Sequence, residues 1–174
     1  MIITETERLF LRHVHLFDAD ALQRVLGDAD VMQFSMTGVL SEASISGWIQ
    51  ECLDNYHRIW GFGPWAIVKK STREVIGYCG PSISEDINEK PEIEIGYRLA
   101  RSEWGQGYAT EAIIAVQDYC FNTLCFPRLV ATIDPQHVAS IHVVEKAGMR
   151  FERPITFPGY DHPDNLYSIE NPNR

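Results

Sequence analysis

The chain has 174 residues, 45% of them hydrophobic and 22% charged, and a formal net charge of −9. This length suits one folded domain and is short for two, so we expect a single domain over residues 1–174. The acidic balance argues against a nucleic-acid-binding surface, which needs clustered basic residues, and no stretch approaches the roughly eighteen apolar residues of a membrane span.

The first third of the chain predicts one strand and two helices. Residues 6–14 alternate apolar and polar side chains, as strands do, and Asp18 stands where a residue caps the next helix. Residues 31–40 have no regular pattern. Ser41 then precedes a helix with one apolar face, formed by Ile45, Trp48, Ile49, Cys52, Leu53 and Tyr56.

The middle third predicts three strands and a helix. Residues 65–69 and 75–82 form a hairpin pattern around the turn K-S-T-R. Residues 92–99, E-I-E-I-G-Y-R-L, alternate as a further strand. A loop with two glycines follows and leads into a helix that we expect to run to about Leu124.

The last third predicts a strand at residues 128–134, a helix at 139–147 that Gly148 ends, and strands at 151–155 and 166–170. The predicted order is β-α-α-β-β-β-α-β-α-β-β. It indicates an α/β fold with a mixed sheet and helices on both faces. The central β-α-β unit is expected to form a parallel, right-handed crossover.

The glycine loop, R-S-E-W-G-Q-G-Y-A-T-E-A over residues 101–112, is the first functional signal. Gly105 and Gly107 permit positive φ or close approach to a ligand, and a helix N-terminus offers free amides and about half a positive charge. A Walker A loop would need Gly-Lys-Ser/Thr after its glycines, and a dinucleotide fingerprint would need Gly or Ala where Thr110 stands. We expect an anion site here; a tight turn without a ligand is the alternative.

Three segments in order, E-I-G-Y-R-L, W-G-Q-G-Y-A-T-E-A and A-S-I-H-V-V-E-K-A-G-M, resemble the GNAT superfamily of acyl-CoA-dependent N-acyltransferases. T-E-R-L-F-L-R near the start is similar to the Rim-type branch, which acetylates N-terminal amines of ribosomal proteins. The resemblance covers about residues 4–151. It implies one GNAT-like domain with a central, mostly antiparallel mixed sheet that contains a splayed parallel strand pair, and it implies acetyl-CoA as co-substrate with no metal.

The resemblance also implies how acetyl-CoA binds. The pyrophosphate would rest on amides of residues 105–110, and the pantetheine arm would lie beside residues 96–99, where a backbone N–H polarises the thioester carbonyl. Trp104 is common in the Rim-type branch, whereas His137 stands where the family usually has Asn, which leaves its contact open. The residues expected at the cofactor are Tyr97, Arg98, Leu99, Trp104, Gly105, Gln106, Gly107, Tyr108, Ala109, Thr110 and His137.

Two residues are candidates for catalysis. Glu94 matches the acidic residue of the family's E-I-G-Y strand and is the candidate base; Glu92 on the same strand face, or water, is the alternative. Many relatives protonate the leaving thiolate with a tyrosine where this chain has Val144. The Rim-type resemblance implies Ser140 instead, unless that hydroxyl only bonds its own backbone. Glu94 could equally be a solvent-facing carboxylate.

The expected acceptor is an amine, in first place a protein or peptide N-terminal α-amine. A small-molecule amine, or an acyl-CoA-binding module without catalysis, is the alternative. We expect a cytoplasmic monomer or homodimer that binds neither nucleic acid nor membrane.

Several other side chains are of a type that could bind a metal or a substrate. The four cysteines contain no CxxC pair, so we expect reduced, buried thiols and no metal site. His13 and His15 share a strand face without a third ligand, and Arg8 and Arg12 are expected on a solvated edge. Trp60, Phe62, Trp65 and Tyr160 are either walls of a substrate cleft or core residues.

Overall fold

The computed structural model describes residues 1–85, 87 and 91–173. An eight-stranded sheet runs through them in the order β1-β2-β3-β4-β5-β6-β8-β7. The strands are β1 (Ile2–Glu5), β2 (Leu9–His13), β3 (Trp65–Lys69), β4 (Val75–Ser84), β5 (Glu92–Leu99), β6 (Arg128–Ile133), β7 (Arg150–Ile155) and β8 (Asp164–Glu170). β5 and β6 are parallel, and the other neighbours are antiparallel. The predicted mixed, mostly antiparallel sheet is confirmed.

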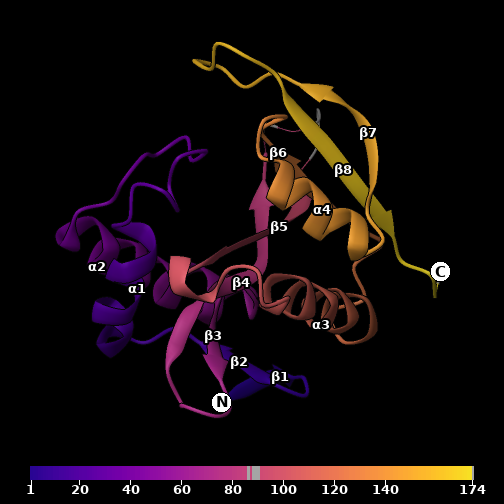
Figure 1. The fold of residues 1–174 in the computed structure, drawn as a ribbon. Coiled ribbons are helices and arrows are strands. Elements are labelled where there is room, and N and C mark those ends of the chain that lie inside the picture. Colours follow the sequence, from indigo (N-terminus) through magenta and orange to yellow (C-terminus); the bar gives the residue numbers. More distant parts are fainter. Residues whose placement is uncertain (86, 88–90, 174) are drawn as a thin grey trace.

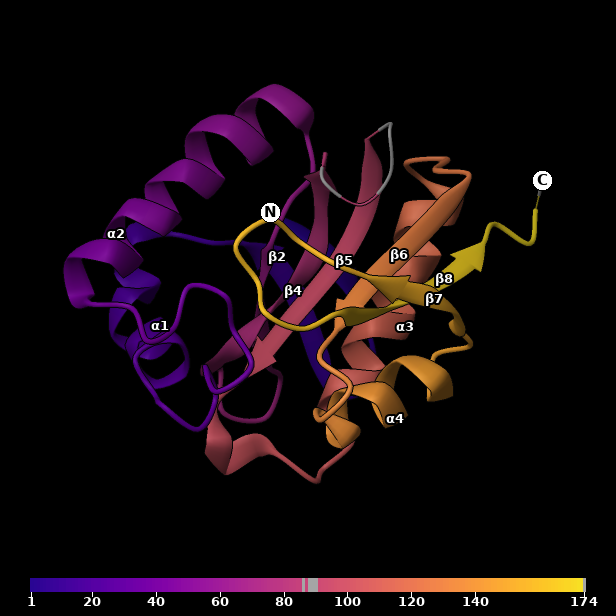
Figure 2. The same ribbon diagram turned by 90° about the horizontal axis from the view of Figure 1, so that it is seen from above.

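Helices cover both faces of the sheet, as predicted (Figures 1 and 2). They are α1 (Ala19–Leu26), α2 (Glu42–Glu51), α3 (Tyr108–Asn122) and α4 (Val138–Lys146), and a π-helical segment, Cys52–Trp60, continues α2. α1 and α2 lie on one face, and α3 and α4 lie on the other. No helix in the described part of the chain combines the length and apolar character needed to cross a membrane.

Strand alternation divides the core into two layers. Successive side chains of a strand point to opposite faces, so Leu9 and Leu11 pack in the layer under α3 and α4, while Phe10 packs in the layer under α1 and α2. β3 is covered on both sides, and its first four residues are buried. β3 is therefore packed on both of its faces, whereas most residues of β5 are only partly buried.

The start of α2 agrees with its predicted cap. The Ser41 hydroxyl accepts a hydrogen bond from the Ser44 amide at 3.2 Å, and Ile45 and Ile49 bury the apolar face. A cap of this kind satisfies one of the amides that a helix start leaves free.

Ser41→Ala is expected to lower the free energy of unfolding by about 1 kcal/mol, because the Ser44 amide loses its partner. Urea unfolding followed by circular dichroism measures this change. Ser46→Ala is the matched control, since Ser46 is exposed in the same helix and alanine is the better helix former. An equal loss in both variants would contradict the capping role.

Two expectations for the N-terminal region were wrong. The first strand is shorter than predicted, and a separate strand, β1, pairs with it. Asp18 does stand at the start of α1, but its carboxylate accepts from the His15 amide at 2.8 Å and pairs with both terminal nitrogens of Arg12 at 2.7 and 2.8 Å. Arg12 is thus half-buried in an ion pair rather than on a solvated edge.

The parallel pair of strands determines where the site lies. The ladder between β5 and β6 is short, with Glu94 opposite Val130. Beyond this pair, β5 continues into the loop before α3, and β6 continues into the loop before α4. Ligands of parallel sheets bind outside the carboxyl ends of the strands, so this end of β5 and β6 is the expected place for a ligand.

Candidate functional site

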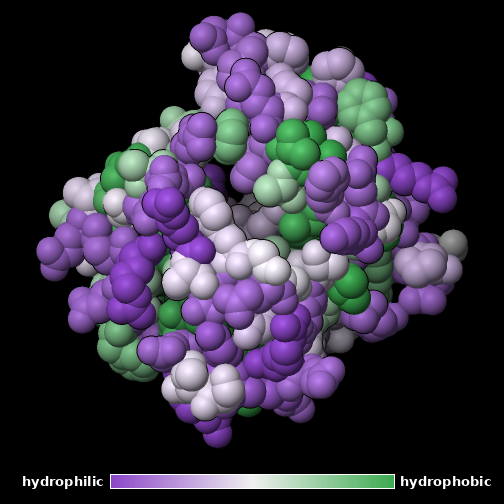
Figure 3. Space-filling view, viewed as in Figure 1, coloured by the Kyte–Doolittle hydropathy of each residue, from purple (hydrophilic) through white to green (hydrophobic). Residues whose placement is uncertain are grey.

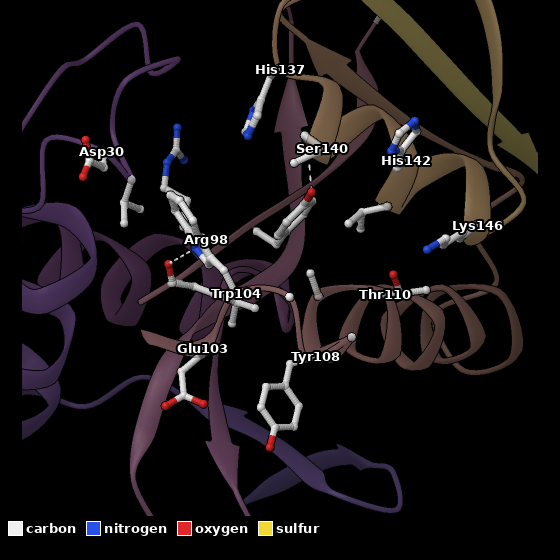
Figure 4. A pocket seen from close by; sticks show the side chains of 18 residues that line it. Asp30, Arg98, Glu103, Trp104, Tyr108, Thr110, His137, Ser140, His142 and Lys146 are labelled. Atoms are coloured by element: carbon white, nitrogen blue, oxygen red, sulfur yellow. Dashed lines mark hydrogen bonds between the residues drawn. The ribbon is translucent and has the colours of Figure 1, made fainter. Parts of the chain in front are cut away.

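A cavity of about 330 Å³ opens at that end, between β5, the glycine loop and α4. Figure 3 shows the surface hollowed near the centre of this face, and Figure 4 shows the side chains around the cavity. Of the eleven residues expected at the cofactor, ten line it, and Gln106 does not. Ser140 also lines the cavity. The lining residues that sequence reasoning missed are Asp30, Val31, Glu103, Ala139, His142, Val143 and Lys146.

Both glycines of the loop adopt the backbone conformation that was predicted for them. The φ angles of Gly105 and Gly107 are 72° and 81°, in the left-handed region that favours glycine. A Cβ at Gly105 would enter open space. Gly107 directly precedes α3, and no side chain caps this helix. The first amides of α3 therefore remain available to an anion at the positive end of the helix dipole.

Arg8, the residue directly before β2, contacts this loop, which the sequence did not indicate. Its Nη1 donates to the Gln106 carbonyl at 2.9 Å, and its guanidinium lies 4.4 Å from the ring centre of Tyr108. Its Nε donates to the Glu111 carboxylate at 2.6 Å. Arg8 is thus exposed, as expected, but its guanidinium is paired with Glu111 and bonded to the loop. The side chain of Gln106 turns back to the Ser102 carbonyl at 3.1 Å, which explains why Gln106 does not line the cavity.

Basic side chains give part of the cavity a positive character. Arg98 lines it from β5, and Lys146 lines it from the last turn of α4 (Figure 4). His137 lines it too, with its ring stacked on Phe34 at 4.4 Å between ring centres. Burial lowers the pKa of His137, and the charge of Arg98 adds to this. A neutral His137 can donate or accept one hydrogen bond.

The Ser140 hydroxyl meets a partner from β5. Tyr97 Oη and Ser140 Oγ are 2.9 Å apart (Figure 4). Burial raises the pKa of Tyr97 to about 12, so the phenol is protonated at neutral pH. Val144, where many relatives have tyrosine, is buried in the core beneath α4. Ser140, the expected proton donor, thus lies beside a second hydroxyl, and the sequence did not reveal this pairing.

Glu94 lies on the opposite face of β5 from Tyr97. Tyr97 packs in the layer under α3 and α4, and alternation directs residues 94 and 96 to the other face. Glu94 Oε1 accepts from the Thr132 amide at 3.2 Å and also from the Thr132 hydroxyl. Burial raises the pKa of Glu94, and the charge of Asp164 raises it further, against the two Thr132 hydrogen bonds and Arg98. A Cβ at Gly96 would enter open space.

Glu92 differs from Glu94 in its surroundings. Its carboxylate is 9% exposed and lies 3.6 Å from Arg128 Nε. Arg128 also pairs with Glu152 at 2.7 Å and with Glu170 at 3.2 Å. Glu92 therefore belongs to an ion-pair group between strands, whereas Glu94 has only neutral donors on its carboxylate in the described structure.

The four aromatic residues that could have formed walls of a substrate cleft differ in their burial. Trp65 is fully buried and Phe62 nearly so, both in the core under α3. Trp60 is exposed, and Tyr160 packs against the small cluster beside β8. The idea of a cleft wall is therefore wrong for Trp65 and Phe62.

The cysteines and the N-terminal histidines show no reactive arrangement. All four cysteines are free, and Cys52, Cys79 and Cys120 are buried as expected, but Cys125 is exposed. Burial raises the pKa of the Cys52 thiol to about 12. His13 stacks on His57 with 4.0 Å between ring centres.

Comparisons with known proteins give the family. The model of the acetyltransferase (GNAT) domain matches residues 8–150. The chain is 36% identical over 151 residues to the uncharacterized protein YkkB of Bacillus subtilis (strain 168), which covers 86% of each chain. It is 31% identical over 147 residues to the uncharacterized N-acetyltransferase p20 of Bacillus licheniformis, over 84% of this chain and 82% of the relative. The chain therefore belongs to the GNAT acetyltransferase family, whose members are acetyl-CoA-dependent N-acetyltransferases.

Solved structures share the fold. A GNAT-family acetyltransferase from Bacillus anthracis superimposes with a TM-score of 0.82 at 25% identity, over 98% of this chain and 99% of that one. The ribosomal L7/L12 α-N-protein acetyltransferase RimL, solved with coenzyme A, has a TM-score of 0.78 at 22% identity over 98% of each chain. The aminoglycoside acetyltransferase AAC(6′)-Ib, also solved with coenzyme A, has 0.75 at 19% over 93% of this chain and 94% of that one. The fold is thus common to enzymes with protein and small-molecule acceptors.

Proposed function

We propose that this N-acetyltransferase moves the acetyl group of acetyl-CoA to a primary amine by direct attack in a ternary complex. The observation that carries this proposal is the arrangement on β5. Glu94 lies on one face of the strand, where open space also adjoins Gly96, and the Tyr97–Ser140 pair lies on the other face. A thioester held at Gly96 would have a base on the side of the amine and a proton donor on the side of the sulfur.

Acetyl-CoA fits the cavity in charge and shape. The free amides after Gly107 would hold the pyrophosphate, and each charge–dipole contact contributes roughly 0.3–1 kcal/mol. Arg98 and Lys146 line the same cavity and would bind phosphate oxygens. The pantetheine arm would lie along residues 97–99, whose backbone N–H groups would polarise the thioester carbonyl.

Glu94 would act on the amine. An α-amine has a reference pKa near 8, so removing its proton at pH 7 costs only about 1.4 kcal/mol. The raised pKa of Glu94 makes its carboxylate a stronger base than an exposed one. As the nitrogen bonds to the carbonyl carbon, its proton passes to Glu94, and the C–S bond then breaks.

The leaving thiolate would take its proton from the hydroxyl pair. Ser140 Oγ lies in the cavity and is hydrogen-bonded to Tyr97 Oη, so the phenol can support the serine as it donates. After the products leave, solvent returns a proton to the hydroxyl pair and removes the proton that Glu94 accepted. The net reaction gives an amide and free coenzyme A.

Ser140→Ala is expected to lower kcat about tenfold and to leave the Kd for acetyl-CoA unchanged, since assistance to a thiolate is worth less than the full range of acid catalysis. Tyr97→Phe is expected to lower kcat by a similar factor. Because the two hydroxyls act together, the double variant should lose little more than either single variant. Steady-state kinetics and acetyl-CoA titration measure both quantities. Multiplicative losses, or wild-type turnover in Ser140→Ala, would contradict the shared role.

Two observations bear on which amine accepts the acetyl group. The Rim-type resemblance supports a peptide α-amine. The carboxylates of Asp134 and Asp164 support a small amine with a second positive charge. Release of coenzyme A across a panel of amines tests the function, with peptides bearing free Ser, Ala and Thr N-termini beside small amines. Turnover of any amine supports the enzyme; binding of acetyl-CoA without turnover on every amine would favour a module without catalysis.

A further inference from the structure

A group of two carboxylates and an imidazole lies outside the cavity already described. It consists of Asp134, His162 and Asp164, and one ligand atom of each lies within 4.8 Å of the others. Asp134 follows β6, and Asp164 begins β8, where Ile133 pairs with Asn165. The imidazole lies 3.5 Å from Asp134 and 3.8 Å from Asp164. The pairing of β6 with β8 thus brings the two carboxylates close together.

One carboxylate oxygen in this group lacks a hydrogen-bond partner. Asp164 is 7% exposed, and its Oδ1 is buried with no hydrogen bond from any described residue. His162 Nδ1 lies at 3.8 Å, beyond hydrogen-bond distance. A buried, ionised carboxylate is unfavourable without a positive partner. Burial and the charge of Asp134 both raise the pKa of Asp164, and His162 lowers it. The buried Oδ1 still has no hydrogen-bond donor among the described residues.

The group lies beside the proposed base. Thr132, which donates to Glu94, is two residues before Asp134, and Asp134 directly follows the end of β6. Two residues along a strand span about 6.6 Å. The charge of Asp164 also acts on Glu94. A cation between Asp134 and Asp164 would therefore sit on the side of β5 from which the amine attacks.

We propose that Asp134 and Asp164 bind a second ammonium group of the acceptor, and that the preferred acceptor is a diamine whose two nitrogens are joined by a short alkyl chain. One nitrogen reacts at Glu94 while the other remains charged and donates to the two carboxylates. The inference rests on the proposed function, because Glu94 defines the reacting end. A divalent metal ion is the other cation that this donor set suits, and the experiment separates the two.

The test compares diaminobutane and diaminopentane with butylamine and pentylamine at saturating acetyl-CoA. A hydrogen bond between charged groups changes an affinity by roughly tenfold to a hundredfold, so wild-type kcat/KM should favour the diamines about tenfold or more. Asp164→Asn is expected to raise KM for the diamines about tenfold. Because the charge of Asp164 also acts on Glu94, the monoamine kinetics are measured beside the diamine kinetics, and the loss for the diamines should exceed any change for the monoamines. The KM for acetyl-CoA should stay unchanged.

Asp161→Asn is the matched control, because the Asp161 side chain is 96% exposed beside the same imidazole. This variant should keep the diamine preference. Asp134→Asn is the second test variant and should lose the preference as Asp164→Asn does. Two variants are used so that the test remains possible if one of them does not fold.

Three results would overturn the inference: equal kcat/KM for diamines and monoamines in the wild type, an unchanged preference in both Asp134→Asn and Asp164→Asn, or loss of the preference when a chelator is added. The last result would assign the group to a metal ion. In each case turnover of the monoamines would leave the proposed function intact. Absence of turnover on every amine would instead contradict the proposed function itself.

Discussion

Glu94→Gln is expected to lower kcat/KM at pH 7 by about 10²-fold or more, because glutamine cannot accept the proton of the attacking amine. Glutamine keeps the oxygen that accepts from Thr132, so the local structure should persist. The folded state raises the pKa of Glu94, so its ionisation reduces stability as pH rises above the unfolded pKa. Removing this charge should not unfold the protein at neutral pH, and lost activity would report on the chemistry.

The pH profile distinguishes a base from a structural residue. In the wild type, activity needs ionised Glu94, and its raised pKa moves the acid limb of the profile upward from that of an ordinary carboxylate. In Glu94→Gln, activity should follow only the free amine, whose reference pKa is near 8 for an α-amine. The loss should therefore shrink as pH rises from about 7 to about 9. Measurements of kcat/KM across this range give the comparison.

Glu92→Gln is the control for this prediction, since Glu92 lies on the same strand but beside Arg128. It should change stability and leave the shape of the pH profile intact. If Glu92→Gln changed the pH profile and Glu94→Gln did not, the base would be Glu92. A Glu94→Gln profile parallel to that of the wild type would remove Glu94 from the mechanism.

Gly105→Val is expected to raise the KM for acetyl-CoA about thirtyfold, from the loss of two amide contacts of about 1 kcal/mol each. Gly105 has a φ of 72°, and a side chain there costs roughly 1–2 kcal/mol in the left-handed region. The added atoms would also occupy the open space in which the pyrophosphate is expected. Steady-state kinetics with acetyl-CoA as the varied substrate measure this change.

Gly61→Val separates backbone strain from the loss of binding. Gly61 has a φ of 75° and also adjoins open space, but it follows the π-helical segment and does not line the cavity. Its variant should lose similar stability and keep its KM. Equal KM values for Gly105→Val and the wild type would show that the loop does not bind acetyl-CoA.

Local patterns in the sequence predicted most of the helices and strands. β5 and the hairpin of β3 and β4 follow from alternation, and the helix after Ser41 follows from its cap and apolar face. The positive φ of Gly105 follows from its place in the loop before a helix. These features are set by residues near one another in the chain, so their signal survives without knowledge of the tertiary structure.

Contacts between distant residues could not be read in the same way. Arg8 bonds the carbonyl of Gln106, and Tyr97 bonds Ser140 on another element. Nothing in the residues near Arg8 distinguishes this contact from a solvated strand edge. The Asp134–Asp164 group likewise depends on the pairing of β6 with β8. Such sites appear only when the topology brings the elements together.

The binding of pyrophosphate by the loop at Gly105 is the central claim, and competition against acetyl-CoA tests it most directly. The inhibition constants of coenzyme A and of pantetheine, which lacks the pyrophosphate and the nucleotide, would be measured for the wild type and for Gly105→Val. We expect the variant to bind coenzyme A about thirtyfold more weakly and pantetheine equally well. An equal loss for both ligands, or no loss for either, would contradict the account.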